Sequence, residues 1–161
     1  MHTIIYDTEG NGLREEITNM WCIVTKELET GEVLKFKPDE IRSGIRVLES
    51  ADRIVCHNQI GYDLPVLKKL YDWVPPPDLE IVDTLVLSRL YNPERRVPRG
   101  WTGVPAPHSI EAWGMRFGRP KPVHEDWSKY TPEMLYRCAE DVEIQTLLYN
   151  HFVERYGDPY G

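Results

Sequence analysis

The amino-terminal segment constrains the fold more than any other part of the sequence. Residues 3–9 begin with the run Thr-Ile-Ile-Tyr, which is typical of a short buried strand, and they end in Asp7 and Glu9 before a turn over residues 10–12. Side chains two positions apart on a strand point to the same face, so these two carboxylates converge. A bound cation is the usual remedy for such repulsion. Alone, an Asp-x-Glu pair is weak evidence, because it is also common on solvated strand ends.

The remaining segments predict one α/β domain over residues 1–161. Apolar and alternating runs predict further strands at 21–26, 33–36 and 53–57. Helical spacing and capping residues predict helices at 38–50, 64–73, 84–91, 109–117 and 131–156. Strands that can pair antiparallel come first and strand–helix alternation follows, which predicts a mixed β-sheet flanked by α-helices.

Composition narrows the class of protein. The net charge of −7 is not that of a chain that binds duplex DNA by bulk electrostatics. The charge is uneven, however, since seven basic residues lie in one proline-rich stretch: Arg89, Arg95, Arg96, Arg99, Arg116, Arg119 and Lys121. This stretch is either a binding surface for a polyanion or a solvated loop, and the sequence favours neither.

No targeting or membrane segment is expected. The first residues lack the charged and apolar regions of a signal peptide, and no apolar run approaches the roughly 20 residues that cross a bilayer. The three cysteines lie in apolar stretches without metal-ligand spacing, which predicts buried free thiols. A cytoplasmic location follows from these features, in the cytoplasm of the host cell if a phage encodes the chain.

Two further acids stand at positions that would bring them near the first pair. Asp63 follows the strand 53–57 at the entry to a helix, where it could simply cap that helix. Asp141 lies beside the apolar face of the last helix, where an acid needs an arginine or a cation as partner. Four carboxylates from a strand end, a helix start and a long helix can together cage hard divalent cations, which prefer oxygen ligands. Two such ions promote phosphodiester hydrolysis.

At these residues the chain resembles the DEDD superfamily of 3′→5′ exonucleases. It is most similar to the proofreading domain of family A DNA polymerases from short-tailed phages. The matching pieces occur in the family's order and span nearly the whole chain: Asp7-Thr-Glu, Cys56-His-Asn-Gln-Ile-Gly-Tyr-Asp63, Val82-Asp-Thr-Leu-Val-Leu-Ser-Arg-Leu90, His108-Ser-Ile-Glu-Ala-Trp-Gly114, and Asp126-Trp-Ser to Asp141-Val142.

The resemblance implies a ribonuclease H-like fold and a site with two Mg²⁺ or Mn²⁺ ions. It makes Asp7, Glu9, Asp63 and Asp141 the metal ligands, with Asp7 bridging both ions. The terminal nucleotide would contact the residues Thr8, Leu13, Asn58 and Tyr62, with Leu13 packing on its base. Asp83 matches the family's helix-capping aspartate, which is not a ligand.

The chain departs from the phage pattern at the residue that orients the attacking water. Tyrosine is expected four residues before the last aspartate, but Arg137 stands there and Tyr136 lies five residues before it. Position i−4 lies about 40° from Asp141 around a helix and i−5 about 140°. Tyr136 would therefore reach the site only from an irregular helix. Arg137 could bind phosphate or neutralise Asp141, and His124 in the preceding loop is a further candidate.

Three functional hypotheses follow. The first is a 3′→5′ exonuclease acting on single-stranded or frayed DNA ends, with a proofreading role beside a separately encoded DNA polymerase as one setting. The second is an exoribonuclease of the same superfamily. The third, supported only by Arg137, is a catalytically weakened domain that binds nucleic acid or a partner. Trp101, Trp113 and Trp127 are candidates for base stacking, with core packing favoured for Trp113.

Overall fold

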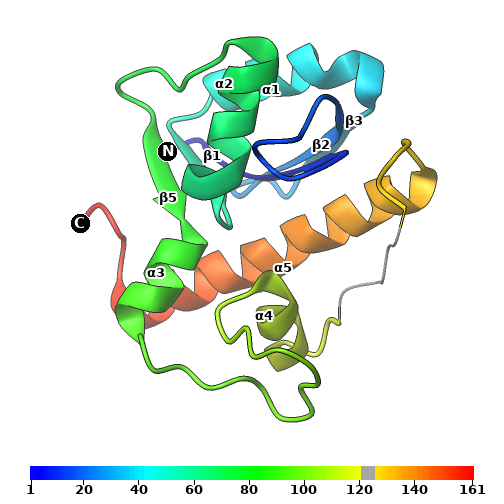
Figure 1. The fold of residues 1–161 in the computed structure, drawn as a ribbon. Coiled ribbons are helices and arrows are strands. Elements are labelled where there is room, and N and C mark those ends of the chain that lie inside the picture. The colour runs from blue at the N-terminus through cyan, green and yellow to red at the C-terminus, as the bar shows by residue number, and fades with distance from the viewer. Residues whose placement is uncertain (121–125) are drawn as a thin grey trace.

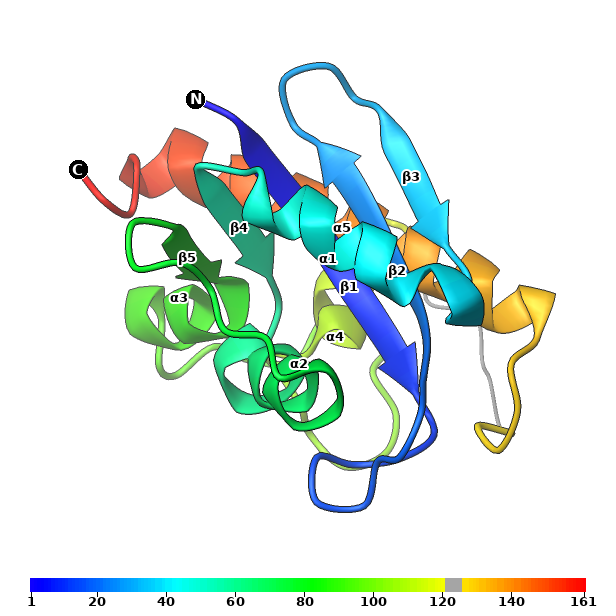
Figure 2. The same ribbon diagram turned by 90° about the horizontal axis from the view of Figure 1, so that it is seen from above.

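The computed structural model describes residues 1–120 and 126–161. Its five strands form one mixed sheet in the order β3-β2-β1-β4-β5, and helices cover both faces (Figures 1 and 2). The strands are β1 (Thr3–Gly10), β2 (Met20–Glu27), β3 (Val33–Phe36), β4 (Arg53–Cys56) and β5 (Glu80–Asp83). The helical elements are η1 (Pro38–Glu40), α1 (Ile41–Glu49), η2 (Gln59–Asp63), α2 (Leu64–Tyr71), α3 (Thr84–Tyr91), α4 (Ile110–Arg116) and α5 (Pro132–Tyr156). The predicted α/β class is confirmed.

Strand β1 is the centre of the sheet. It pairs antiparallel with β2 and parallel with β4, while β3 extends the sheet beyond β2 and β5 extends it beyond β4. The sequence did not predict β5, which has an acid at each end and only Ile81 and Val82 between them. It is a strand because it pairs with β4 and because the Tyr160 hydroxyl bonds both the amide and the carbonyl of Ile81.

Alternation along β1 sends successive side chains to opposite faces of the sheet. Ile4 and Tyr6 belong to the core beneath α1 and α2. Ile5 belongs to the core beneath α5, which crosses the other face of the sheet (Figure 2). Continuing this alternation places Asp7 and Glu9 on the α5 face and Thr8 on the α2 face. The strand thus directs the two carboxylates toward α5 and the Thr8 hydroxyl toward α2.

The helices begin and end close to their predicted bounds. α2 stops at Tyr71, two residues earlier than expected, because Asp72 adopts the left-handed conformation with a φ of 52°. α4 packs on the carboxyl half of α5 through a third apolar cluster that includes Trp113 and Phe152. In the described part of the chain, no helix has the length and apolar character needed to cross a membrane.

Candidate active site

Asp7 and Glu9 lie at the carboxyl end of β1. The pairing of β1 with β4 ends at Ile5 and Val55, so both acids project beyond the end of β4. Asp7 is 9% exposed, and Glu9 is half-buried. One carboxylate oxygen of Asp7 and one of Glu9 lie within 4.8 Å of each other. The two acids therefore converge, as the spacing along the strand predicts.

Asp63 approaches the same spot from the α2 side. It is the last residue of η2, a π-helical turn, and it is 2% exposed. The Thr8 hydroxyl donates a hydrogen bond to Asp63 at 2.5 Å, and an Asp63 oxygen lies within 4.8 Å of Asp7. Asp63 makes no capping hydrogen bond to α2, so a purely capping role is wrong. Thr8, predicted as a substrate contact, uses its hydroxyl to orient Asp63 and lines the same pocket.

Asp83 holds the turn that carries Asp63. Its Oδ1 accepts hydrogen bonds from the amides of Asn58 at 2.8 Å and Leu85 at 2.9 Å, and its Oδ2 accepts one from Ile60 at 3.0 Å. The predicted helix-capping role of Asp83 is confirmed for α3. The same carboxylate also stabilises the start of η2, where Asn58 has a φ of 66°. Asp83 does not line the pocket into which Asp7 and Asp63 project.

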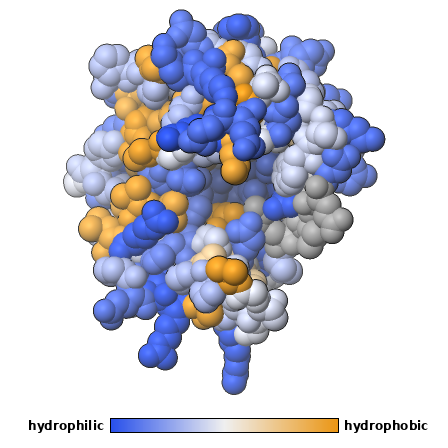
Figure 3. Space-filling view, in the orientation of Figure 1, coloured by the Kyte–Doolittle hydropathy of each residue, from blue (hydrophilic) through white to orange (hydrophobic). Residues whose placement is uncertain are grey.

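Asp141 completes the group from α5. It is 4% exposed and lines, together with Asp7, Glu9 and Asp63, an open pocket of about 200 Å³. We call this hollow the catalytic pocket; the face drawn in Figure 3 is hollowed across its middle. Oxygen donors gathered at low exposure suit hard divalent cations, whose charge offsets the cost of burying carboxylates together. The donor set therefore fits the expected metals.

Two thiols adjoin the carboxylates, which sequence reasoning did not anticipate. All three cysteines are buried and free, as predicted. The Cys138 sulfur, however, lies 3.4 Å from the Asp7 carbonyl oxygen and 3.6 Å from its Oδ2, and Cys56 lies within 4.8 Å of Asp7 and Asp63. Cys138 stands three residues before Asp141, hence on the same face of α5. That spacing was the available signal.

Burial changes the proton affinity of Asp63. Loss of hydration raises its pKa from 3.8 to about 7, although the Thr8 hydrogen bond opposes this. A raised pKa in the folded state gives stability that is complete below pH 3.8 and lost as the pH rises through about 7. We therefore expect the free energy of unfolding of the metal-free protein to fall across this interval.

Urea denaturation in EDTA between pH 4 and pH 8 measures this effect. Asp63→Asn should flatten the dependence, since asparagine does not titrate. An equally steep fall in the Asn variant would assign the titration to another group.

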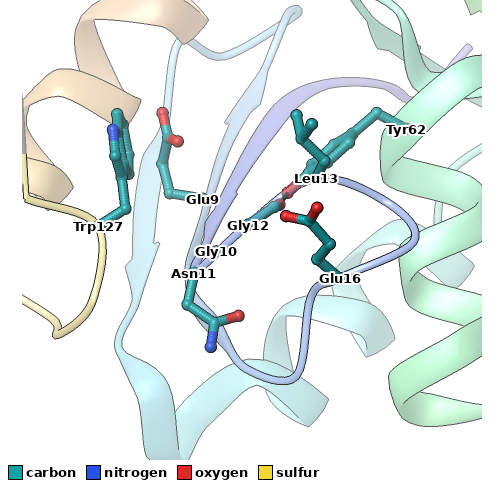
Figure 4. Close-up of a pocket in the computed structure, with 8 residues that line it drawn as sticks. All are labelled: Glu9, Gly10, Asn11, Gly12, Leu13, Glu16, Tyr62 and Trp127. Atoms are coloured by element: carbon teal, nitrogen blue, oxygen red, sulfur yellow. Dashed lines mark hydrogen bonds between the residues drawn. The ribbon is translucent and has the colours of Figure 1, made fainter.

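A second hollow, the loop pocket, lies beside the catalytic pocket. It has a volume of about 380 Å³ and is lined by Glu9, Leu13, Glu16, Tyr62, Trp127 and residues 10–12 (Figure 4). The Tyr62 hydroxyl donates to the Gly12 carbonyl at 2.8 Å and so fastens the β1–β2 loop. The structure thus brings Leu13 and Tyr62 together next to Glu9. Asn58 lines the catalytic pocket.

The candidates for orienting water are distributed differently. α5 is α-helical from Pro132 onward, and Tyr136 is 59% exposed and lines neither pocket, so the structure does not bring it to the site. The Arg137 guanidinium packs over the Trp127 ring at 5.0 Å. The physical reason is helical geometry. Tyr136 lies five residues before Asp141 and therefore on a different face of the regular helix. His124 lies outside the described residues.

The basic stretch is not one uniform surface. Arg95 and Arg116 stack on Trp113 at 4.6 and 4.5 Å, and Arg119 pairs with Glu140 at 3.0 Å. Trp113 is 3% exposed and therefore a core residue, as favoured from sequence. Arg89, Arg96 and Arg99 are exposed, while Lys121 lies outside the described residues. Among the described residues, only the exposed arginines of the basic stretch are therefore available to bind a ligand.

Two polar residues near the catalytic pocket were not predicted from the sequence. Gln145, four residues after Asp141 on the same helical face, lines the catalytic pocket and accepts a hydrogen bond from the His57 amide at 3.3 Å. The His57 ring reaches the Thr84 hydroxyl and the His108 carbonyl, both at 2.8 Å. These bonds tie the end of β4 to α3 and to the residues that precede α4. These bonds therefore hold together three of the segments that resemble the exonuclease family, residues 56–63, 82–90 and 108–114.

Comparison with known proteins agrees with this arrangement. The chain is 30% identical to the DNA-directed DNA polymerase of Escherichia phage T7 over 183 aligned positions, which cover 90% of this chain. The chain is homologous to that phage DNA polymerase. It spans 26% of the length of the phage protein. No family model matches the sequence.

Solved structures share the fold at low sequence identity. The family B DNA polymerase of Pyrobaculum calidifontis superposes with a TM-score of 0.68 at 16% identity, covering 95% of this chain and 24% of that one. Escherichia coli exonuclease I, in complex with a dT13 oligonucleotide, superposes with a TM-score of 0.63 at 15% identity, covering 96% and 41%. The predicted ribonuclease H-like fold and the resemblance to phage polymerases are both confirmed.

Proposed function

We propose that this chain is a metal-dependent exonuclease that hydrolyses phosphodiester bonds at the 3′ end of single-stranded or frayed DNA. The observation that carries the proposal is the convergence of Asp7, Glu9, Asp63 and Asp141 in one open pocket. The polymerase homology and the fold shared with exonuclease I support it. A role beside a DNA polymerase, in the same or a separate chain, is part of the proposal because the relative is a polymerase.

Two divalent cations, Mg²⁺ or Mn²⁺, are the proposed cofactors. Asp7 would contact both, because its carboxylate lies within 4.8 Å of Glu9 and of Asp63. Glu9 and Asp141 would share one ion, and Asp63 would serve the other. Bound ions of this kind activate water and stabilise the attacking and leaving oxygens of the phosphodiester.

The protein's own groups position the parts of the site. Thr8 orients Asp63, and Asp83 holds the turn from which Asp63 projects. The bond from Tyr62 to the Gly12 carbonyl fastens the loop that bears Leu13, so that Leu13 can pack on the terminal base. Asn58, which also lines the catalytic pocket, would contact the same nucleotide.

Arg137 is proposed to bind a phosphate oxygen of the substrate rather than to neutralise Asp141. Among the described residues Arg137 forms no ion pair, and its buried Nε has no hydrogen-bond partner. Trp127 supports the guanidinium, while the Trp127 carbonyl accepts a bond from the Trp21 indole at 2.9 Å. Since guanidinium keeps its charge near neutral pH, Arg137 can stabilise negative charge but cannot accept a proton.

A 5′-labelled oligothymidylate tests the proposed function. With Mg²⁺ or Mn²⁺, the protein should shorten it one nucleotide at a time from the 3′ end, and excess EDTA should stop the reaction. A matched RNA oligonucleotide measures sugar preference. Degradation that persists in EDTA, or that starts at the 5′ end, would contradict the proposal.

A further inference from the structure

The catalytic pocket opens on two sides. It shares Glu9 and Tyr62 with the loop pocket. On the other side it shares His57, Asn58 and Ile110 with a third hollow of about 490 Å³, the α3–α4 pocket. The catalytic pocket with its carboxylates therefore lies between the two other hollows, and we call the three together the groove.

The α3–α4 pocket has the size and lining of a site for one nucleotide. Its volume falls within the range of about 300–1,000 Å³ that is common for small-molecule sites. Leu85 from α3, Ile110 from α4 and prolines 105 and 107 offer apolar surface to a base. Arg89 is the only lysine or arginine among the described lining residues, and Glu111 is the only acid. A cation beside an apolar wall suits a nucleotide that carries a phosphate.

Arg89 differs from the engaged arginines of the basic stretch because its charge is available, and it is the arginine that lines the α3–α4 pocket. Arg95, Arg116 and Arg119 are engaged with Trp113 or Glu140. Arg89 stands in the last turn of α3 with an exposed side chain, and within the described ranges it forms no ion pair and no ring contact. It can therefore meet an anion without first breaking an internal contact.

The walls of the α3–α4 pocket are fastened to the catalytic pocket. The His57 Nε2–H donates to the His108 carbonyl at 2.8 Å, since a carbonyl can only accept. The His108 ring in turn lies 2.7 Å from the Ser88 hydroxyl, which also accepts the Trp113 indole N–H at 3.1 Å. These bonds hold the wall at residues 105–108 against α3. The pocket is thus built before any ligand arrives.

The loop pocket at the opposite end has the reverse charge. Glu9 and Glu16 line it, and none of its described lining residues is lysine or arginine. A polyanion would be repelled if its phosphates continued through that end. The charge difference along the groove therefore favours a strand whose phosphates lie on the Arg89 side and whose last nucleotide enters the loop pocket.

We propose that the α3–α4 pocket binds the nucleotide on the 5′ side of the scissile bond, with Arg89 contacting its phosphate and the apolar wall packing on its base. The inference rests on the proposed exonuclease function and names the part of the site that holds the remaining strand. It also gives a reason for attack at a chain end, because the acidic loop pocket accepts a nucleotide that no further phosphate follows.

Two substrates separate this subsite from the catalytic centre. Oligothymidylate fills the whole groove, whereas the p-nitrophenyl ester of thymidine 5′-monophosphate has no nucleotide on the 5′ side. Arg89→Ala should raise the KM for the oligonucleotide about tenfold more than the KM for the ester, with little change in kcat. Arg46→Ala is the matched control, since Arg46 also is an exposed arginine in the last turn of a helix, α1. It should leave both KM values unchanged.

Binding of oligothymidylate without turnover gives a second readout. Measured by fluorescence anisotropy in EDTA, the dependence of log K on log salt should become shallower by about 0.7 in Arg89→Ala, the loss expected for one phosphate contact on a single strand. If the wild-type protein cleaves neither substrate, the proposed function itself fails. If it cleaves both, and Arg89→Ala changes the two KM values equally or not at all, only the subsite inference is overturned.

Discussion

Replacing Asp7 by alanine is expected to lower kcat by about 10³-fold or more. Asp7 belongs to both of the ligand groups whose atoms lie within 4.8 Å of one another, one with Glu9 and one with Asp63. Its loss should therefore weaken both ion positions at once. Metal ions contribute several kcal/mol to stabilising the transition state, and each 1.36 kcal/mol is worth about tenfold in rate. Single-turnover cleavage of labelled oligothymidylate in Mg²⁺ measures the loss.

The same variant should fold normally. Asp7 is 9% exposed and converges with other acids, so its removal relieves repulsion in the metal-free protein. We expect the Tm in EDTA to be equal to or higher than that of the wild type. Asp78→Ala, which removes an exposed acid, is the charge control and should keep full activity. An Asp7→Ala protein that retains activity within tenfold of the wild type would contradict the proposed role of Asp7.

Replacing Asp83 by alanine is expected to cause the largest loss of stability. Its carboxylate accepts four backbone amides, from Asn58, Ile60, Leu85 and Val86, at 2.8 to 3.4 Å, and it is 5% exposed. A lost helix cap costs about 1 kcal/mol, and hydrogen bonds to a charged group about 1.5–3 kcal/mol. Together they predict a decrease of about 3–4 kcal/mol in the free energy of unfolding, measurable by urea denaturation in EDTA.

The isosteric variant Asp83→Asn distinguishes capping from charge. Asparagine keeps one carbonyl oxygen for the amides of Asn58 and Leu85 but cannot accept from Ile60 with its amide nitrogen. About half of the stability loss should therefore remain in this variant. Activity should fall in both variants as well, because η2 carries Asp63. A loss below about 1 kcal/mol in Asp83→Ala would show that water replaces these bonds without cost.

Much of the site was predictable because its signals are local. The same-face placement of Asp7 and Glu9 follows from the two-residue period of a strand. The 3.6-residue turn of a helix allowed the candidate Tyr136 to reach the site only from an irregular helix, and in the structure α5 is continuous and Tyr136 is exposed. The capping role of Asp83 was also recognisable, because an aspartate before a helical apolar run is a common N-cap.

Other features were not predictable because they depend on pairing across the chain. β5 is too short and too acidic to be identified alone, and β4 makes it a strand. The π-helical turn of η2 exists because Asp83, some 20 residues later, holds its first amides. The spacing from Asp141 places Cys138 on the same face of α5, but the approach of its sulfur to 3.6 Å from Asp7 depends on how α5 packs on β1.

The sequence by itself determined which side chains could form a metal site and the fold class that would carry them, because side-chain direction within a strand or helix is a property of the local backbone. Only the tertiary structure decided which of those side chains meet. It placed Thr8 on Asp63, moved Arg95 and Arg116 into the packing around Trp113, and left Arg89 on the wall of an open pocket. Contacts between distant elements depend on sheet order and helix packing, and no local pattern encodes these.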